Sequence, residues 1–258
     1  GHQARQRQPG CHRPTLLEEY TAPMMNDKEH KHDYTEVGVA LVKEEARWRK
    51  ELQEKTLAFI RENPSSVVAF DQLVALFSDF TVNYSGKQID EMRSWVADAW
   101  TGTPQLAALD SIVSRIKPVA LGEKYADIDV QTPDGKTVKL SSLIPEGKYV
   151  MLEFWASWCG PCRAEMPHVK QPMRSSTNQG FEIIGVSLDN NAEAWKKAID
   201  QLKLSWPQMS DLKGWNCEGA RLYGVSAIPA TVLIKDGKIV ARDLRGDSLM
   251  TLLPTLLK

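Results

Sequence analysis

The sequence predicts an α/β domain with a mixed sheet, preceded by a small all-α domain. From about Tyr34 to Lys117, apolar residues recur at helical spacing. From about Val119, short β-rich runs alternate with helical segments, and the last two runs are joined by Asp236-Gly237, a short-hairpin dipeptide. Strands that alternate with helices and end in a hairpin imply a mixed sheet covered on both faces. The expected parts are a tail (1–33), a helical domain (34–118) and an α/β domain (119–258).

The composition excludes several classes of protein. The chain of 258 residues is 42% apolar and 25% charged, which is typical of soluble globular proteins and excludes collagen-like or wholly disordered chains. A formal net charge of −1 argues against bulk nucleic-acid binding. No apolar run approaches the ~20 residues of a membrane-spanning helix. No signal peptide is visible, although a chain that starts at Gly1 is compatible with a removed one. The tail has no apolar period, and we expect it to be disordered or loosely docked.

Four helices are expected in the helical domain. The first ends at Asn63-Pro64, because proline restricts the preceding residue and cannot continue the hydrogen-bond ladder. Ser65 or Ser66 can cap the second helix. The fourth begins at Thr103-Pro104, a cap residue followed by proline at the first helical position. The expected apolar faces are Val37, Leu41, Trp48, Leu52 and Phe59; Phe70, Leu73, Val74 and Phe77; Ile89, Met92, Val96 and Ala99; and Leu106, Leu109, Val113 and Ile116.

The α/β domain is expected to begin with a hairpin around Pro133-Asp134-Gly135. A buried strand follows and leads directly to the cysteines. The helix after the cysteines contains Pro167, where we expect a kink. Strands are expected at 128–130, 138–140, 149–155, 181–188, 230–234 and 238–242, and further helices at 192–204 and 248–257.

The chemistry centres on Cys159 and Cys162, which form a Cys-x-x-Cys motif between a buried strand and a helix. Unpaired N–H groups and a partial positive charge at a helix N-terminus stabilise a thiolate on the first cysteine. Cys159 is therefore the candidate nucleophile. Cys162, one turn into the helix and more buried, would resolve the mixed disulfide.

A zinc site, a purely structural disulfide and a chance match to the motif are the alternatives to redox chemistry at these two cysteines. A zinc site needs further paired ligands, and the remaining His168 and Cys217 do not stand in a paired spacing. A structural disulfide closing so short a loop would stabilise the chain little. Cys217 is more simply a buried free thiol. The sequence context favours redox activity.

The segment Phe154-Trp155-Ala156-Ser157-Trp158-Cys159-Gly160-Pro161-Cys162 resembles the active site of the thioredoxin superfamily. Ile228-Pro229-Ala230-Thr231 resembles the cis-proline loop of that family. The likeness covers about residues 119–258, and the hairpin and added helix favour the TlpA/ResA type of envelope thiol:disulfide oxidoreductase, with an AhpC/TSA-type domain. This resemblance implies a thioredoxin fold and a redox-active disulfide, with no metal and no organic cofactor.

The resemblance also implies roles for particular residues. Trp158, Gly160, Pro161, Ile228 and Pro229 would form the substrate-binding surface, and the Ile228 backbone would pair with an extended substrate segment.

Two carboxyl groups are further candidates. Glu153 stands in an otherwise apolar strand six residues before Cys159, where thioredoxins carry a buried acid that relays the proton of the second cysteine. The alternative is that Glu153 points outward at a sheet edge. Glu165, three residues after Cys162, matches an acid common in TlpA/ResA proteins. It could equally complement the helix dipole as a first-turn acid.

The predicted function is thiol-disulfide exchange with protein disulfides, as a reductase in the periplasm or cell envelope of a bacterium. The partners would be protein disulfide substrates and an upstream thiol donor, which could be membrane-embedded, with no nucleic acid. Two alternatives stay open: a thiol peroxidase of the peroxiredoxin-like branch, and a partner-binding module with a vestigial dithiol.

Overall fold

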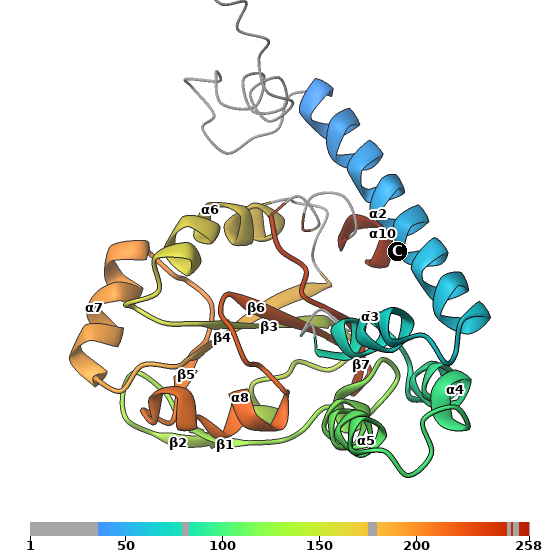
Figure 1. The fold of residues 1–258 in the computed structure, drawn as a ribbon. Coiled ribbons are helices and arrows are strands. Elements are labelled where there is room, and N and C mark those ends of the chain that lie inside the picture. Colours follow the sequence, from blue (N-terminus) through green and yellow to red (C-terminus); the bar gives the residue numbers. More distant parts are fainter. Residues whose placement is uncertain (1–35, 79–82, 175–179, 247–248, 250–252, 258) are drawn as a thin grey trace, which may run out of the picture. The chain divides into compact units, whose positions relative to one another are not determined.

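The computed structural model describes residues 36–78, 83–174, 180–246, 249 and 253–257 (Figure 1). The predicted tail lies outside them. The chain divides into two compact units, 1–49 and 50–258, and helix α2 (Glu36–Glu62) runs across the division. The second unit holds every other helix and strand described below. None of the helices in the described residues is both long and apolar enough to cross a membrane.

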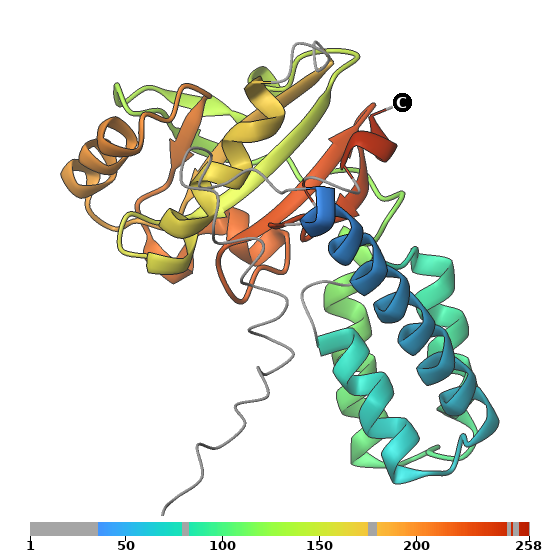
Figure 2. The same cartoon turned by 90° about the horizontal axis from the view of Figure 1, so that it is seen from above.

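Residues 50–62 of α2 pack with three further helices, α3 (Val67–Ser78), α4 (Gly86–Ala97) and α5 (Pro104–Ile116) (Figure 2). A short 3-10 helix, η1 (Lys117–Val119), follows α5. These helices share a hydrophobic core of their own, which includes Ile60, Phe70, Leu73, Phe77, Ile89, Met92, Val96, Leu106, Leu109 and Val113. The helical character of this region was therefore predicted correctly, but Ala99, expected on the third apolar face, lies after α4 and is exposed.

Side chains cap three of these helices. Ser66 Oγ accepts a hydrogen bond from Ala69 N at 3.4 Å, and Thr103 Oγ1 accepts one from Leu106 N at 3.2 Å, as predicted. Ser85 and Gln88 form a reciprocal capping box at the start of α4, which was not predicted.

The predicted apolar face of the first helix is wrong. Trp48, Leu52 and Phe59 are 54%, 66% and 39% exposed. The face of residues 50–62 that packs against the other helices instead carries Ile60, which is fully buried, and the half-buried Leu57. Gln53 is exposed, and its amide donates to the Tyr84 hydroxyl. The predicted stripe therefore lies on the wrong side of this part of the helix, since Leu52 and Phe59 are exposed while Leu57 and Ile60 pack.

The sheet has seven strands in the order β2-β1-β5-β4-β3-β6-β7. Strands β3, β4 and β5 are parallel, and β1, β2, β6 and β7 add in antiparallel fashion, so the sheet is mixed as predicted. The strands are β1 (Asp129–Gln131), β2 (Thr137–Lys139), β3 (Tyr149–Trp155), β4 (Phe181–Ser187), β5 (Gln208–Ser210), β6 (Ala230–Lys235) and β7 (Lys238–Arg242).

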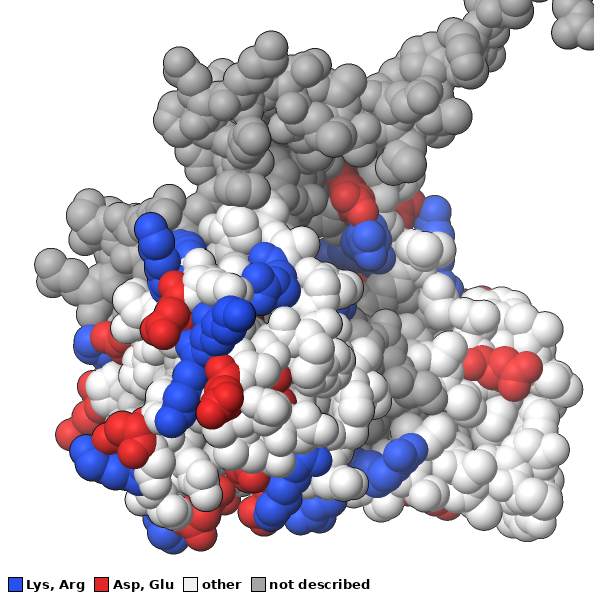
Figure 3. All heavy atoms as spheres, turned by 90° about the vertical axis from the view of Figure 1, so that its left-hand side faces the viewer, with Lys and Arg blue, Asp and Glu red and all other residues white. Residues whose placement is uncertain are grey.

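Helices lie on both faces of the sheet. Figure 1 shows α6 (Gly160–Arg174) on one face and α8 (Glu218–Leu222) on the other. The remaining elements are the helices α7 (Ala192–Leu202) and α10 (Leu253–Leu256) and the 3-10 helices η2 (Leu140–Ser142) and η3 (Gly214–Asn216). On the surface that carries α7, basic and acidic side chains are interspersed (Figure 3), in keeping with the near-zero net charge.

Several predicted elements differ in detail. Helix α6 runs through Pro167 to Arg174, so this proline lies inside the helix as predicted. Strand β5 was missed because three residues give no measurable period. Of the helix expected at 248–257, only Leu253–Leu256 is described as α10, and part of the range lies outside the described residues.

Gly185 in strand β4 leaves room for a buried hydrogen bond between Trp155 and Gln208. The indole N–H of Trp155, which is fully buried, donates to Gln208 Oε1 at 3.0 Å. The amide group of Gln208 lies directly over Gly185, and a Cβ atom at position 185 would collide with it. The strand therefore needs glycine there because no other residue leaves room for Gln208.

We predict that Gly185→Ala displaces Gln208 and breaks its hydrogen bond to Trp155. Loss of a buried hydrogen bond, together with local overpacking, should lower the free energy of unfolding by about 2 kcal/mol. Urea unfolding of the oxidised protein measures the effect.

Gly180→Ala is the matched control, because no atom lies within 4 Å of an added Cβ there. Equal unfolding free energies for the two variants would contradict the proposed role of Gly185.

Candidate active site

The two cysteines lie where the central strand β3 passes into α6, and they form a disulfide. The S–S distance is 2.05 Å and the Cα–Cα distance is 5.3 Å. Cys159 is 5% exposed and Cys162 is fully buried. A substrate can therefore approach the sulfur of Cys159 more readily than that of Cys162.

The sulfur of Cys159 lies at the N-terminus of α6. The backbone N–H of Cys162 points at this sulfur, with an N–S distance of 3.1 Å, and the Cys159 carbonyl accepts a helical hydrogen bond from Arg163 N at 3.1 Å. Free N–H groups and the helix dipole favour negative charge at such a position. When the disulfide is reduced, this geometry stabilises a thiolate on Cys159.

A buried carboxylate fixes the turn between β3 and α6. Asp189, 1% exposed, follows strand β4. Its Oδ2 accepts hydrogen bonds from Ser157 N at 2.9 Å and Ser187 Oγ at 2.7 Å, and its Oδ1 accepts one from Ser157 Oγ at 2.5 Å. Neighbouring β4 therefore holds the turn that carries the cysteines.

The loop before β6 faces the disulfide. The Ile228–Pro229 peptide bond is cis, as the resemblance implied. The carbonyl oxygen of Ile228 lies 3.8 Å from Cys159 Sγ. Arg245 Nη1 donates to the Pro229 carbonyl at 3.0 Å, which secures this loop from the segment after β7.

Two tryptophans present aromatic surface beside the site. Trp158 is 53% exposed, and its ring centroid lies 6.4 Å from that of Trp215, which is 50% exposed. Gly160 and Pro161 are also exposed. These residues form an accessible rim next to the nearly buried Cys159.

Glu153 is buried in the middle of the sheet. It pairs in register with Gly185 of β4 and Thr231 of β6, so it does not lie at an edge, and the outward-pointing alternative is wrong. Neither carboxylate oxygen has a hydrogen-bond partner in the described structure. Burial, aided by the charge of Glu165, raises the pKa of Glu153 to about 8.

Glu165 does not have the first-turn position that was one of the two predictions for it. It lies beyond the first turn of α6, which contains no acidic residue, so a first-turn role is wrong. Its carboxylate accepts a hydrogen bond from Gly246 N. Glu165 thus links α6 to the segment after β7 and adds negative charge near Glu153.

The described residues contain no cluster of His, Cys, Asp and Glu that could hold a metal ion. Cys217 is a buried free thiol, as predicted, and burial raises its pKa.

Three residues of the site were not predicted from the sequence. Asp189, Trp215 and Arg245 stand far from the cysteine motif in sequence, and the sheet topology brings them to it. The one available signal was Asp189, an acidic residue directly after an apolar strand.

Comparisons with known proteins agree with this geometry. Residues 121–242 match the AhpC/TSA family. The chain is 39% identical over 113 residues to thiol-disulfide oxidoreductase ResA of Oceanobacillus iheyensis, covering 44% of this chain and 56% of that protein, which is less than two thirds of its length. It is 32% identical over 146 residues to ResA of Bacillus cereus, covering 56% of this chain and 81% of that protein.

A solved structure of similar sequence is the thioredoxin domain of a thiol-disulfide oxidoreductase from Bacteroides vulgatus. It is 34% identical, with a TM-score of 0.49, over 54% of this chain and 99% of that one. The matched region contains the disulfide, the turn that carries it and the cis-proline loop. The chain belongs to the AhpC/TSA family of thioredoxin-like proteins and, within it, to the thiol-disulfide oxidoreductases of the ResA type.

Proposed function

We propose that this protein reduces disulfides of other proteins, with Cys159 as the nucleophile and Cys162 as the resolving cysteine. One observation carries the proposal: Cys159 Sγ receives the Cys162 N–H at the start of α6 and faces the cis Ile228–Pro229 loop. A purely structural disulfide would need neither an activating helix end nor a peptide loop beside one sulfur.

The reaction transfers two electrons by two exchanges. In the reduced protein, the Cys159 thiolate attacks a substrate disulfide, the substrate S–S bond breaks, and one substrate thiolate leaves. Cys162, after losing its proton, attacks Cys159 Sγ of the mixed disulfide and releases the second substrate thiolate. The protein ends with the Cys159–Cys162 disulfide seen in the structure.

Glu153 is proposed to accept the proton of Cys162. Its carboxyl group is buried and without a hydrogen-bond partner in the described structure, on the strand that leads to the cysteines. A pKa of about 8 is close to that of an ordinary thiol, about 8.5, so proton transfer between the two groups is nearly balanced.

The substrate is proposed to lie across the rim of Trp158, Gly160 and Pro161, with its backbone paired to that of Ile228. An extended segment placed there meets exposed groups and brings its disulfide to Cys159. Glu165 is proposed to act indirectly, through its charge on Glu153.

The wider setting is also part of the proposal. The TlpA/ResA resemblance supports a reductase in the bacterial periplasm or cell envelope, re-reduced by an upstream thiol donor. The redox-active disulfide is the only redox group that the mechanism requires. Residues 34–118 are proposed to form a helical domain that is separate from the catalytic domain, 119–258, since the two hydrophobic cores are distinct.

We predict that the reduced protein accelerates dithiol-dependent reduction of insulin. Cys159→Ser should abolish this activity, because the nucleophile is lost. Cys162→Ser should instead trap mixed disulfides with substrate on Cys159, which mass spectrometry of the trapped species can locate.

Cys217→Ser is the matched control and should keep full activity, because Cys217 is buried away from this chemistry. A folded protein without dithiol-dependent turnover would refute the proposal. Peroxide consumption in its place would support the peroxidase, and the absence of any reversible two-electron titration would support the binding module.

Glu153→Gln should slow the release of product from the mixed disulfide by about tenfold above pH 8, where the wild-type carboxyl group is ionised and can accept the proton. In the wild type the rate should rise as pH passes through about 8, and this inflection should be missing in the variant. Stopped-flow tryptophan fluorescence over a pH series measures both effects. A variant whose pH profile overlays that of the wild type would refute the role of Glu153.

The same carboxyl group makes stability depend on pH. Its pKa is 4.5 in the unfolded chain and about 8 when folded, so between these values the folded state binds the extra proton. Stability should therefore fall as pH rises from 4.5 to about 8, by several kcal/mol at most, and level off above. Urea unfolding of oxidised wild type and Glu153→Gln should show a difference that widens with pH. A constant difference would contradict the raised pKa.

A further inference from the structure

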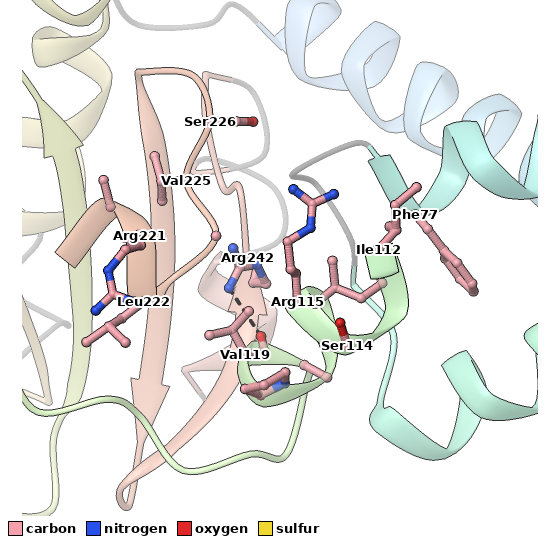
Figure 4. Close-up of a pocket in the computed structure, with 15 residues that line it drawn as sticks. Phe77, Ile112, Ser114, Arg115, Val119, Arg221, Leu222, Val225, Ser226 and Arg242 are labelled. Atoms are coloured by element: carbon pink, nitrogen blue, oxygen red, sulfur yellow. Dashed lines mark hydrogen bonds between the residues drawn. The ribbon is translucent and has the colours of Figure 1, made fainter. Parts of the chain in front are cut away.

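A cavity lies next to the loop that precedes β6. Its volume is about 730 Å³. One wall comes from α3, the end of α5 and η1, and the other from α8, the loop before β6 and the end of β7 (Figure 4). Nothing in the proposed mechanism uses this cavity.

All the charged side chains that line the cavity are positive. Three arginines line it: Arg115 from α5, Arg221 from α8 and Arg242 from β7, and no lining residue is acidic. Arg115 is exposed and has no ion pair in the described part of the chain. Within the described residues, Arg221 has one ion-pair partner, Glu218 at 3.9 Å, and its side chain is 71% exposed. The surroundings therefore favour an anion.

Arg242 supplies a buried positive charge. It is 5% exposed, and its guanidinium donates to the carbonyl oxygens of Val119 at 3.1 Å and Tyr223 at 2.6 Å. Burial lowers the pKa of Arg242 to about 10, so it is still protonated at neutral pH. Carbonyl groups satisfy its N–H donors but do not neutralise it. The charge of the neighbouring Asp243 favours the protonated Arg242, but Asp243 is itself paired with Arg245. Buried charges are usually paired, so this one is suited to an anionic ligand.

The rest of the lining is largely apolar. Phe77, Ile112, Ile116, Val119, Leu222 and Val225 all contribute to it. A small inorganic anion would leave these apolar side chains in contact with water. The lining fits a negatively charged group that is carried on an apolar or aliphatic body.

The place of the cavity in the chain indicates the source of that group. Val225 and Ser226 line the cavity and lead directly to Ile228 and Pro229, the loop that faces Cys159. Only Ala227 separates Ser226 of the lining from Ile228, so the cavity adjoins the backbone to which the substrate is proposed to pair. We propose that the cavity binds an acidic side chain of the substrate protein, close to its reactive cysteine, and so selects acidic substrate segments. This inference rests on the proposed function.

The test compares disulfide-linked peptides that differ only in a Glu or Gln placed in turn at each position on either side of the cysteine. At low salt, wild-type protein should reduce the best Glu peptide with a kcat/KM about fivefold above that of its Gln counterpart. Added salt should diminish the preference. Arg115→Glu should remove or reverse it while leaving the rate for the Gln peptide unchanged.

Arg61→Glu is the matched control. Arg61 and Arg115 are both exposed and both lie in the last turn of a helix, but only Arg115 lines the cavity. Equal rates for Glu and Gln peptides, or a preference that survives Arg115→Glu, would overturn the acidic-segment proposal and leave the reductase intact. Failure of folded, reduced wild type to reduce any peptide would overturn the reductase itself and the inference with it.

Discussion

The hydrogen bonds between Asp189 and Ser157 are the constraint on which the site depends. They fix the turn between β3 and α6, and this turn decides where Cys159 lies relative to the helix N-terminus and to Ile228. Strand β3 lies between β4 and β6, so it cannot shift without disturbing both neighbours. The disulfide is therefore held at the end of a central strand of the sheet. Its position at the helix N-terminus, and with it the electrostatic environment of the Cys159 sulfur, stays constant.

Two buried ionisable side chains belong to strands of this sheet. Glu153 within β3 and Arg242 at the end of β7 are 1% and 5% exposed. Glu153 has no hydrogen-bond partner in the described structure, and the guanidinium of Arg242 donates to backbone carbonyl oxygens. Such groups cost stability, and a chain selected for stability alone would favour apolar residues there. Each has a use in the proposed chemistry. Glu153 exchanges a proton with the resolving cysteine, and Arg242 attracts the charge of a substrate.

Local patterns in the sequence predicted much of the fold. The strand that contains Glu153, the cap at Thr103 and the hairpin at Asp236-Gly237 depend on neighbouring residues, and the structure has all three. The predictions failed where distant parts of the chain decide the outcome. Leu57 and Ile60 pack while Leu52 is exposed, because the helices that meet α2 come from later parts of the chain. Likewise, Asp189 and Arg245 reach the site only through the order of the strands, which no local pattern contains.

The central claim is that the end of α6 makes Cys159, and not Cys162, the reactive thiolate. The most direct measurement is the pH dependence of alkylation of the fully reduced protein, with the modified cysteine identified by mass spectrometry. Cys159 should react first, with a pKa below the value of about 8.5 for free cysteine. Faster alkylation of Cys162, or equal alkylation of both with an ordinary thiol pKa, would contradict the claim.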